Sequence, residues 1–140
     1  MEVHVEHLGS VQFEIKTRGH SLVSDQPTEN GGFDEGLTPP ELLLASLGSC
    51  AGFYAAQYLR QHKLATEGIR VRVTCEKVKD PVPRMTNFVI AVDAPVELTE
   101  AERQGVHQAV ESCLVHNTLL HPPEIMLKVE GAVPAAQTKP

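Results

Sequence analysis

Two cysteines, Cys50 and Cys113, are the residues whose type and placement could support redox chemistry. They stand 63 positions apart in the sequence, and each falls on the apolar stripe of a segment with a helical pattern. A thiol on a buried helical face, met by a second thiol, can reduce a peroxide through a sulfenic acid and then a disulfide. The pair therefore predicts thiol-based redox chemistry.

Cys50 becomes a useful nucleophile only as a thiolate, and its expected position does not favour that form. Desolvation raises the pKa of a thiol, and the middle of a helix gains little from the N-terminal dipole. A cation must therefore stand beside it. Arg18 is attractive because a guanidinium stays charged when partly buried, although an arginine at a strand end is commonly a solvated edge residue. The candidates are Arg18, His20, Arg60, His62 and His116.

Glu41 has a structural and a functional interpretation. With Thr38 it matches a capping box, in which its carboxylate closes the start of a helix. Nine positions separate it from Cys50, roughly 13 Å along a helix axis, so the two side chains cannot touch within one helix. If Glu41 acts at the site, it does so by holding Arg18 or by reaching the thiol of a second subunit.

Bulk composition limits the class of protein that carries these residues. The 140 residues, 41% hydrophobic and 21% charged, predict a single globular domain over residues 1–140. A net charge of −6 argues against a nucleic-acid partner. The N-terminus lacks the pattern of a signal peptide, and three cysteines are too few for a secreted disulfide framework. We expect a cytoplasmic protein without a membrane partner.

The first third of the chain changes pattern twice. Residues 1–24 alternate apolar and polar side chains in short runs, which predicts two or three antiparallel strands. Residues 25–38 are rich in glycine and acidic side chains and predict a loop long enough to be functional. A helix follows, with Thr38 as its N-cap and Pro39 at its first position, and should run to about His62.

The first half of this helix is apolar on nearly every side, so it must be covered all round. A membrane span is disfavoured because Glu41 and Arg60 bracket a stretch of only about 18 residues. Small side chains let another backbone approach closely, and we expect a second subunit to supply part of the cover. These small residues are Ala45, Ser46, Gly48, Ser49, Ala51 and Gly52.

The second half predicts a hairpin, a helix and a closing strand. Residues 69–76 alternate with the period of a half-buried strand, which makes Cys75 an ordinary core thiol. Residues 88–92 form its expected partner strand after a proline turn. A second Thr-x-x-Glu signal at Thr99 begins a helix that carries Cys113 near its end. Residues 124–130 read as a closing strand.

Two motifs resemble a known family. The run from Gly31 to Cys50, which includes Leu-Thr-Pro-Pro-Glu-Leu-Leu and Ser-Leu-Gly-Ser-Cys, and the later run from Cys113 to Leu119 are similar to the OsmC/Ohr family. This family comprises osmotically inducible protein C and the organic hydroperoxide resistance proteins. The resemblance spans nearly the whole chain, and Leu47-Gly48-Ser49-Cys50 resembles the general OsmC-like branch.

The resemblance implies an α+β fold that forms an intertwined homodimer with sites at the subunit interface. Cys50 would be the peroxidatic thiolate and Cys113 the resolving thiol, with Arg18 steadying the thiolate and Glu41 paired to that arginine. The implied substrate is an organic or inorganic hydroperoxide, and the implied reductant is a dithiol of lipoyl or thioredoxin type. No metal or organic cofactor is needed.

The apolar neighbours of Cys50 refine the expected substrate. An apolar pocket would favour an alkyl hydroperoxide over hydrogen peroxide. The side chains expected to line it are Leu43, Leu47, Phe53 and Tyr54.

Two alternatives compete with the peroxidase hypothesis. Cys50, Cys113 and His116 could bind zinc, since thiolate and imidazole are its usual ligands, although a Cys-x-x-Cys pair is missing. The chain could also be a non-catalytic dimer that binds a small apolar ligand, with both thiols packed as core.

Overall fold

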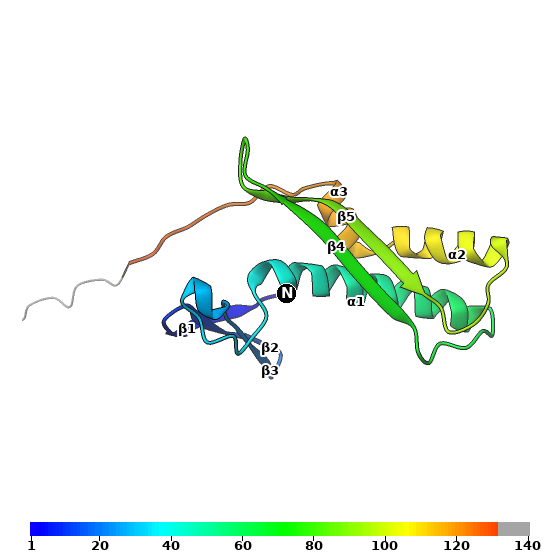
Figure 1. Cartoon of the computed structure of the whole chain (residues 1–140), viewed down its shortest axis with the longest axis horizontal. Coiled ribbons are helices and arrows are strands. Elements are labelled where there is room, and N and C mark those ends of the chain that lie inside the picture. Colours follow the sequence, from blue (N-terminus) through cyan, green and yellow to red (C-terminus); the bar gives the residue numbers. More distant parts are fainter. Residues whose placement is uncertain (132–140) are drawn as a thin grey trace, which may run out of the picture.

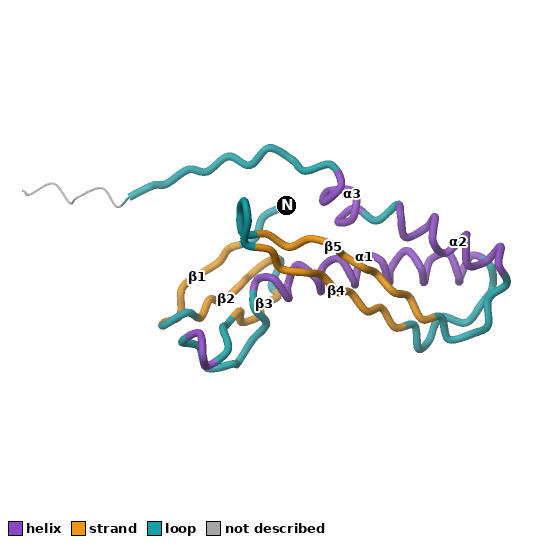
Figure 2. Tube along the Cα trace, turned by 45° about the horizontal axis from the view of Figure 1, so that its top comes forward, coloured by secondary structure: helices purple, strands orange, loops and turns teal. Residues whose placement is uncertain are grey.

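A computed structural model of the chain describes residues 1–131. The single-domain prediction also covers residues 132–140, which lie outside the described residues. An N-terminal sheet stands apart from a second layer in which a long hairpin lies across the central helix (Figures 1 and 2). The N-terminal sheet has the antiparallel order β1-β2-β3 and consists of β1 (His4–Gly9), β2 (Gln12–Thr17) and β3 (His20–Ser24).

A tight turn joins β2 to β3 at Arg18 and Gly19. Both residues have positive φ, 48° and 80°, as two-residue hairpin turns with the twist of the flanking strands require. Thr17 pairs with His20 on either side of the turn. Arg18 therefore lies at the tip of a hairpin with its side chain exposed.

The loop after β3 is built around the buried carboxylate of Asp25, which is 1% exposed. The carboxylate accepts hydrogen bonds from the backbone N–H groups of Gln26, Phe33 and Glu35 at 2.8, 3.0 and 3.1 Å. The Gln12 amide donates a fourth at 3.1 Å. The loop contains the short 3-10 helix η1 (Thr28–Asn30) and is fixed in shape by these four donors.

The predicted start of the central helix is confirmed. The helix α1 (Pro39–Gln61) begins with Thr38 as N-cap, Pro39 at its first position and a complete capping box with Glu41. It ends one residue before the predicted His62. The buried side chains of α1 are Leu47, Ala51, Ala55 and Leu59.

The hairpin of β4 (Arg70–Val78) and β5 (Arg84–Asp93) crosses one face of α1 (Figure 1). Val73 and Val71 of β4 approach Gly48 and Gly52, where an added Cβ would lie 3.1 and 3.4 Å from a valine methyl group. The small residues of α1 therefore admit the side chains of β4 in the same chain.

The pairing of β4 with β5 contains a bulge. Thr74 pairs with Val89 and Glu76 with Thr86, so β5 carries one extra residue in this interval. Asn87 lies in it with φ 52°, and its side-chain amide donates to Glu76 at 2.7 Å. The bulge changes the direction of β5 beside α3.

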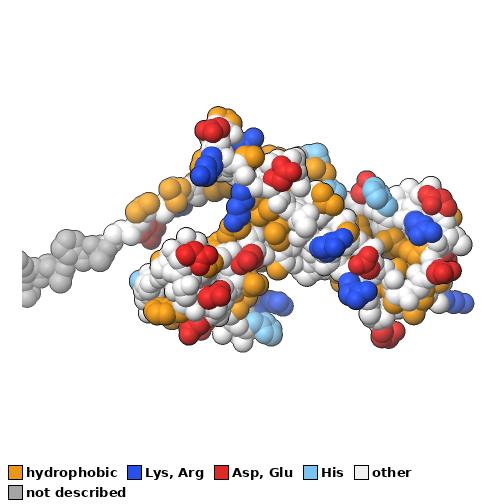
Figure 3. Space-filling view, viewed as in Figure 1, with side chains coloured by type: hydrophobic (Ala, Val, Ile, Leu, Met, Phe, Trp, Pro, Cys, Tyr) orange, Lys and Arg blue, Asp and Glu red, His pale blue; other side chains and the backbone are white. Residues whose placement is uncertain are grey.

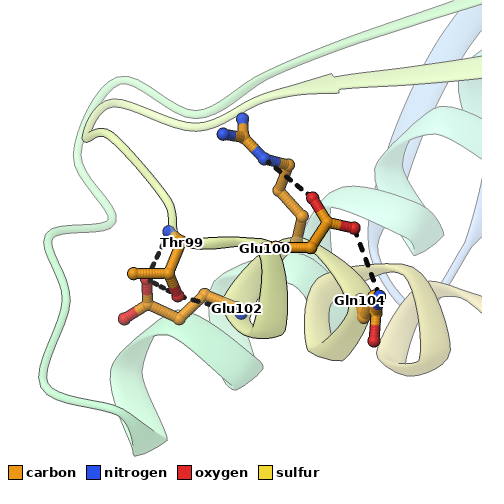
Figure 4. Close-up of polar contacts among 5 residues, drawn as sticks. Thr99, Glu100, Glu102 and Gln104 are labelled. Carbon is orange, nitrogen blue, oxygen red and sulfur yellow. Dashed lines mark hydrogen bonds and ion pairs between the residues drawn. The ribbon is translucent and has the colours of Figure 1, made fainter.

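Two helices complete the described fold. The second predicted capping box is confirmed at α2 (Glu100–Glu111), where Thr99 and Glu102 bond reciprocally at 2.7 and 3.3 Å (Figure 4). Its Val106 packs with Ala55 and Leu59 of α1 to form the buried core. The short helix α3 (Leu114–Leu120) then packs against α1. The α+β fold class is confirmed.

Two predicted elements differ from the structure. Cys113 does not lie near the end of an amphipathic helix: α2 ends at Glu111, and Cys113 is the N-cap of α3. The predicted closing strand at 124–130 is wrong for the single chain, where the segment runs outward without strand pairing (Figure 1). A strand needs the edge of a neighbouring strand to pair with, and this segment has no such neighbour among the described residues. Its Leu127 is accordingly 86% exposed.

By length and composition α1 could also cross a membrane, and it is the one helix to meet that test in the part of the chain that the structure describes. A buried helix in the core of a soluble protein has the same length and composition.

Candidate functional site

The fold brings Cys50 and Cys113 together. Cys50 projects from the middle of α1, and Cys113 precedes α3, which packs against α1. The two thiols lie close enough that Cys50 raises the pKa of Cys113 through a side-chain contact. Both are free thiols. The third cysteine, Cys75, is half-buried on β4 and also free.

The two thiols differ in their surroundings. Cys113 is fully buried, whereas Cys50 is partly exposed. Burial is the main cause of the raised pKa of Cys113, and the neighbouring Cys50 adds to it. Hydrogen bonds from the backbone N–H groups of His116 and Val115 act in the opposite direction. Cys113 is therefore held as a neutral thiol beside a more accessible partner.

Cys113 also has a structural task as the N-cap of α3. Its Sγ accepts a hydrogen bond from the backbone N–H of His116 at 3.4 Å. The first N–H groups of a helix have no partner within the helix, so a side chain must supply one. Cys113 is the residue that the family resemblance predicts to be the resolving thiol, and its role as N-cap of α3 holds its sulfur in place.

Of the five candidate cations, His116 is the one that the fold places next to the thiol pair. Its backbone is bonded to Cys113. Arg60 and His62 lie at the C-terminal end of α1. The ring of His62 stacks there on the ring of Tyr58, with the ring centroids 4.0 Å apart. His20 lies at the start of β3 and is exposed.

The single chain does not bring Arg18 to the thiols. It lines a shallow pocket whose other walls come from the N-terminal segment and the β2–β3 hairpin, with no contribution from α1 or α3 among the described residues. The pocket residues are His4, Lys16, Thr17, Arg18, Gly19, His20 and Ser21.

Glu41 performs the capping role. Its carboxylate accepts hydrogen bonds from the backbone N–H and the hydroxyl of Thr38, both at 2.8 Å. These bonds lower the pKa of Glu41, and the positive charge of Lys77 contributes to the same direction. The side chain is exposed, so a contact with a residue of a second subunit is sterically open.

A cavity of about 500 Å³ lies between α1, β5 and α3, and its lining residues Leu47 and His116 are three positions from Cys50 and Cys113 in the sequence. Two of the four predicted pocket residues, Leu43 and Leu47, line it. Phe53 and Tyr54 do not, and Phe53 is 62% exposed. The sequence did not identify the β5 and α3 walls, because only the tertiary packing brings them to α1. These walls consist of Met85, Thr86, Asn87, Phe88, Ile90, His116, Leu119 and Leu120.

The zinc alternative gains no support from the geometry. Within residues 1–131, no three His, Cys, Asp or Glu side chains are grouped so that they could hold a metal ion. Cys50, Cys113 and His116 therefore do not converge as a ligand set there.

Comparison with known proteins places the chain in a family. The family described as OsmC-like protein matches residues 32–128, which include both cysteines of the pair. The chain belongs to the OsmC-like protein family. Among curated protein sequences, none matches this chain.

Solved structures share the fold over most of their length. An osmotic stress induced and detoxification response protein from Psychrobacter arcticus superposes with a TM-score of 0.75 at 23% identity, covering 83% of this chain and 85% of that one. An organic hydroperoxide resistance protein OsmC from Legionella pneumophila gives 0.63 at 16% identity, covering 85% and 89%. Another organic hydroperoxide resistance protein, from Elizabethkingia anophelis, gives 0.60 at 15% identity, covering 84% and 87%.

Proposed function

We propose that the protein is a thiol-dependent peroxidase that reduces organic hydroperoxides through Cys50 and Cys113. The observation that carries the proposal is the proximity of two free thiols, which the packing of α3 against α1 brings together from separate elements. Membership of a family that includes hydroperoxide resistance proteins supports the same class of reaction.

The different surroundings of the two thiols suggest their roles. Cys50 is the accessible thiol and acts as the nucleophile. Burial keeps Cys113 protonated until the sulfenic acid has formed on Cys50. The Cys50 thiolate attacks the terminal peroxide oxygen, an S–O bond forms, the O–O bond breaks, and the alkoxide leaves and takes a proton from water to become the alcohol. The Cys113 thiol then displaces water from the sulfenic acid, which gives a disulfide. A dithiol reductant restores both thiols by exchange.

The second part of the proposal is a homodimer. Several large apolar side chains are open to solvent in the single chain, among them Phe33, Phe53 and the alternating residues of 124–130. Figure 3 shows apolar side chains at the surface near the centre of the molecule and along the C-terminal segment. A second copy would cover α1 and offer a strand edge to residues 124–130. It would also bring Arg18 to the thiols of its partner.

A cytoplasmic location is consistent with the need for a dithiol reductant of lipoyl or thioredoxin type, since such thiols stay reduced there. The acidic net charge of −6 gives no reason to expect a nucleic-acid partner.

Turnover of cumene hydroperoxide with dihydrolipoamide tests the proposal. The wild type should consume peroxide catalytically, and Cys50→Ser should lose both turnover and the first oxidation. Cys113→Ser should react with one equivalent but not form the intramolecular disulfide. The matched control is Cys75→Ser, which removes the remaining thiol and should leave the rate unchanged. Peroxide consumption by Cys50→Ser at the wild-type rate would exclude the proposed nucleophile.

A further inference from the structure

The imidazole of His116 has no polar partner in the described part of the chain. Its Nδ1 is the one buried side-chain nitrogen or oxygen without a hydrogen bond among residues 1–131. Its Nε2 makes no hydrogen bond to those residues either, and only the backbone N–H of His116 is engaged. Buried polar groups in folded proteins nearly always find partners, so each exception requires an explanation.

The burial of Nδ1 indicates which nitrogen carries the proton. A neutral imidazole has one N–H donor and one bare acceptor nitrogen. A buried N–H without an acceptor is the rarer of the two defects. The proton is therefore assigned to Nε2, which makes His116 a hydrogen-bond donor whose acceptor is missing from its own chain.

His116 lies in the wall of the cavity of about 500 Å³ between α1, β5 and α3. The other walls are mainly apolar, from leucines of α1 and α3 and from Met85, Phe88 and Ile90 of β5. Sites for small ligands have this character, with a large apolar surface and few polar groups that fix orientation. The β5 bulge at Asn87 forms part of the same wall, and bulges are frequent next to binding sites.

The backbone of His116 also lies close to the buried thiol of Cys113. The backbone N–H of His116 is bonded to Cys113 Sγ at 3.4 Å, and Cys113 lies near enough to Cys50 for that thiol to raise its pKa. Leu47, which lines the cavity, is one helical turn from Cys50 on α1. The end of the cavity bounded by Leu47 and His116 is therefore the end from which the polar group of a ligand would face the thiols.

We propose that His116 contacts the substrate and that its Nε2–H donates to an oxygen of a hydroperoxide whose apolar group fills this cavity. The proposal rests on the proposed peroxidase function and narrows its substrate to hydroperoxides with a bulky aryl or branched alkyl group. As the Cys50 thiolate takes the terminal OH and the O–O electron pair moves to the leaving oxygen, this hydrogen bond stabilises the alkoxide. Water then supplies the proton that completes the alcohol.

Kinetics of three variants with cumene hydroperoxide and hydrogen peroxide test this role. His116→Leu removes the donor and keeps the apolar packing, whereas His116→Gln retains an N–H near the position of Nε2. The control, His107→Leu, changes an exposed histidine of α2 outside this cavity. His116→Leu should lower kcat for cumene hydroperoxide by about 100-fold, as for loss of one donor to a developing oxyanion.

The pattern across substrates and variants decides the outcome. His116→Gln should recover most of kcat, and the rate with hydrogen peroxide should hardly change in either variant, because hydrogen peroxide has no group to fill the cavity. Equal losses for both peroxides, or no loss in a folded His116→Leu protein, would overturn the proposal.

Binding of an unreactive product analogue separates this inference from the proposed function. In Cys50→Ser, 2-phenyl-2-propanol should shift the imidazole NMR signals of His116. Adding His116→Leu should weaken the binding, which is followed in that variant through the NMR signals of the alcohol itself. If the wild type shows no peroxidase activity but this binding is present, the peroxidase proposal fails, and what stands is that His116 donates to an oxygen-bearing apolar ligand in this cavity. If the imidazole signals of His116 do not shift at saturating alcohol, the proposed role of His116 is contradicted.

Discussion

The backbone N–H of His116 donates to the Sγ of Cys113 at 3.4 Å, so the start of α3 depends on the thiol proposed to form a disulfide. Joining Cys113 to Cys50 would turn its sulfur toward α1 and weaken this cap. A helix of seven residues has little other support at its first turn.

The first prediction concerns α3 in the two redox states. Oxidation to the Cys50–Cys113 disulfide should speed amide hydrogen exchange at His116 and its neighbours in α3, while exchange in α2 should stay unchanged. Mass spectrometry of exchanged peptides measures both helices in one experiment. Equal protection of α3 in the reduced and oxidised proteins would show that the cap survives oxidation.

Two substitutions at Cys113 separate its capping role from its redox role. Serine can still accept the hydrogen bond from His116, whereas alanine cannot. Cys113→Ala should be less stable than Cys113→Ser by about 1 kcal/mol, the usual cost of a lost N-cap. Chemical denaturation measures the difference. Neither variant can form the disulfide, so the comparison does not depend on the redox role. Equal stability of Cys113→Ala and Cys113→Ser would contradict the capping role of Cys113.

A third prediction concerns Asp25 and acid stability. Burial opposes ionisation of Asp25, but four hydrogen bonds outweigh it and lower its pKa from 3.8. A carboxyl whose pKa is lower in the folded protein contributes stability above its unfolded pKa, and that contribution is lost as the pH falls through the folded pKa. Asp25→Asn should therefore have a lower Tm at pH 7, and the difference should shrink below about pH 4.

Thermal unfolding from pH 3 to pH 7 measures this prediction. Glu29→Gln is a suitable control because it removes an exposed carboxylate from the same loop. A Tm difference between wild type and Asp25→Asn that stays constant with pH would show that the carboxylate charge is not the source of the stability.

A fourth prediction tests whether Arg18 acts across the subunit interface. Within one chain Arg18 is at the tip of the β2–β3 hairpin, outside the cavity walls of α1 and α3. Arg18→Ala and Cys50→Ser should each be inactive alone. Mixing them under exchange conditions should restore roughly a quarter of wild-type activity, because half of the dimers carry one intact site of two. If activity does not recover after verified subunit exchange, Arg18 does not act on the Cys50 thiol of the other subunit.

A fifth prediction tests the dimer through its exposed apolar surface. Phe53→Glu places a charge on the uncovered face of α1 and should convert the dimer to monomer in sedimentation analysis. Val82→Glu is the matched control, since Val82 is also 62% exposed but lies in the β4–β5 turn. A monomeric wild type, or equal behaviour of both variants, would refute the proposed interface at α1.

Local signals predicted the parts of the fold that depend on neighbouring residues. The Thr-x-x-Glu pairs at Thr38 and Thr99 mark both long helices because the capping box is formed within four residues. The alternation around Val71 and Val73 identified β4 for a similar reason, since one face of a strand meets one layer. The apolar positions of Cys50 and Cys113 and the family resemblance predicted that the two thiols lie near each other, as they do, while their roles stay a prediction.

Features that depend on distant residues were not predictable in the same way. The break between α2 and α3 at Cys113 has no glycine or proline to mark it. Asp25 looked like one of several acidic loop residues, and only its burial among four donors distinguishes it. The cavity around His116 joins three elements, so no single segment carries its pattern.

The most direct test is to treat the reduced protein with one equivalent of cumene hydroperoxide and to map its thiols by mass spectrometry. The account predicts loss of two of the three thiols per chain, a linked peptide joining Cys50 to Cys113, and a free Cys75. Three free thiols after the treatment, or a disulfide that includes Cys75, would contradict it.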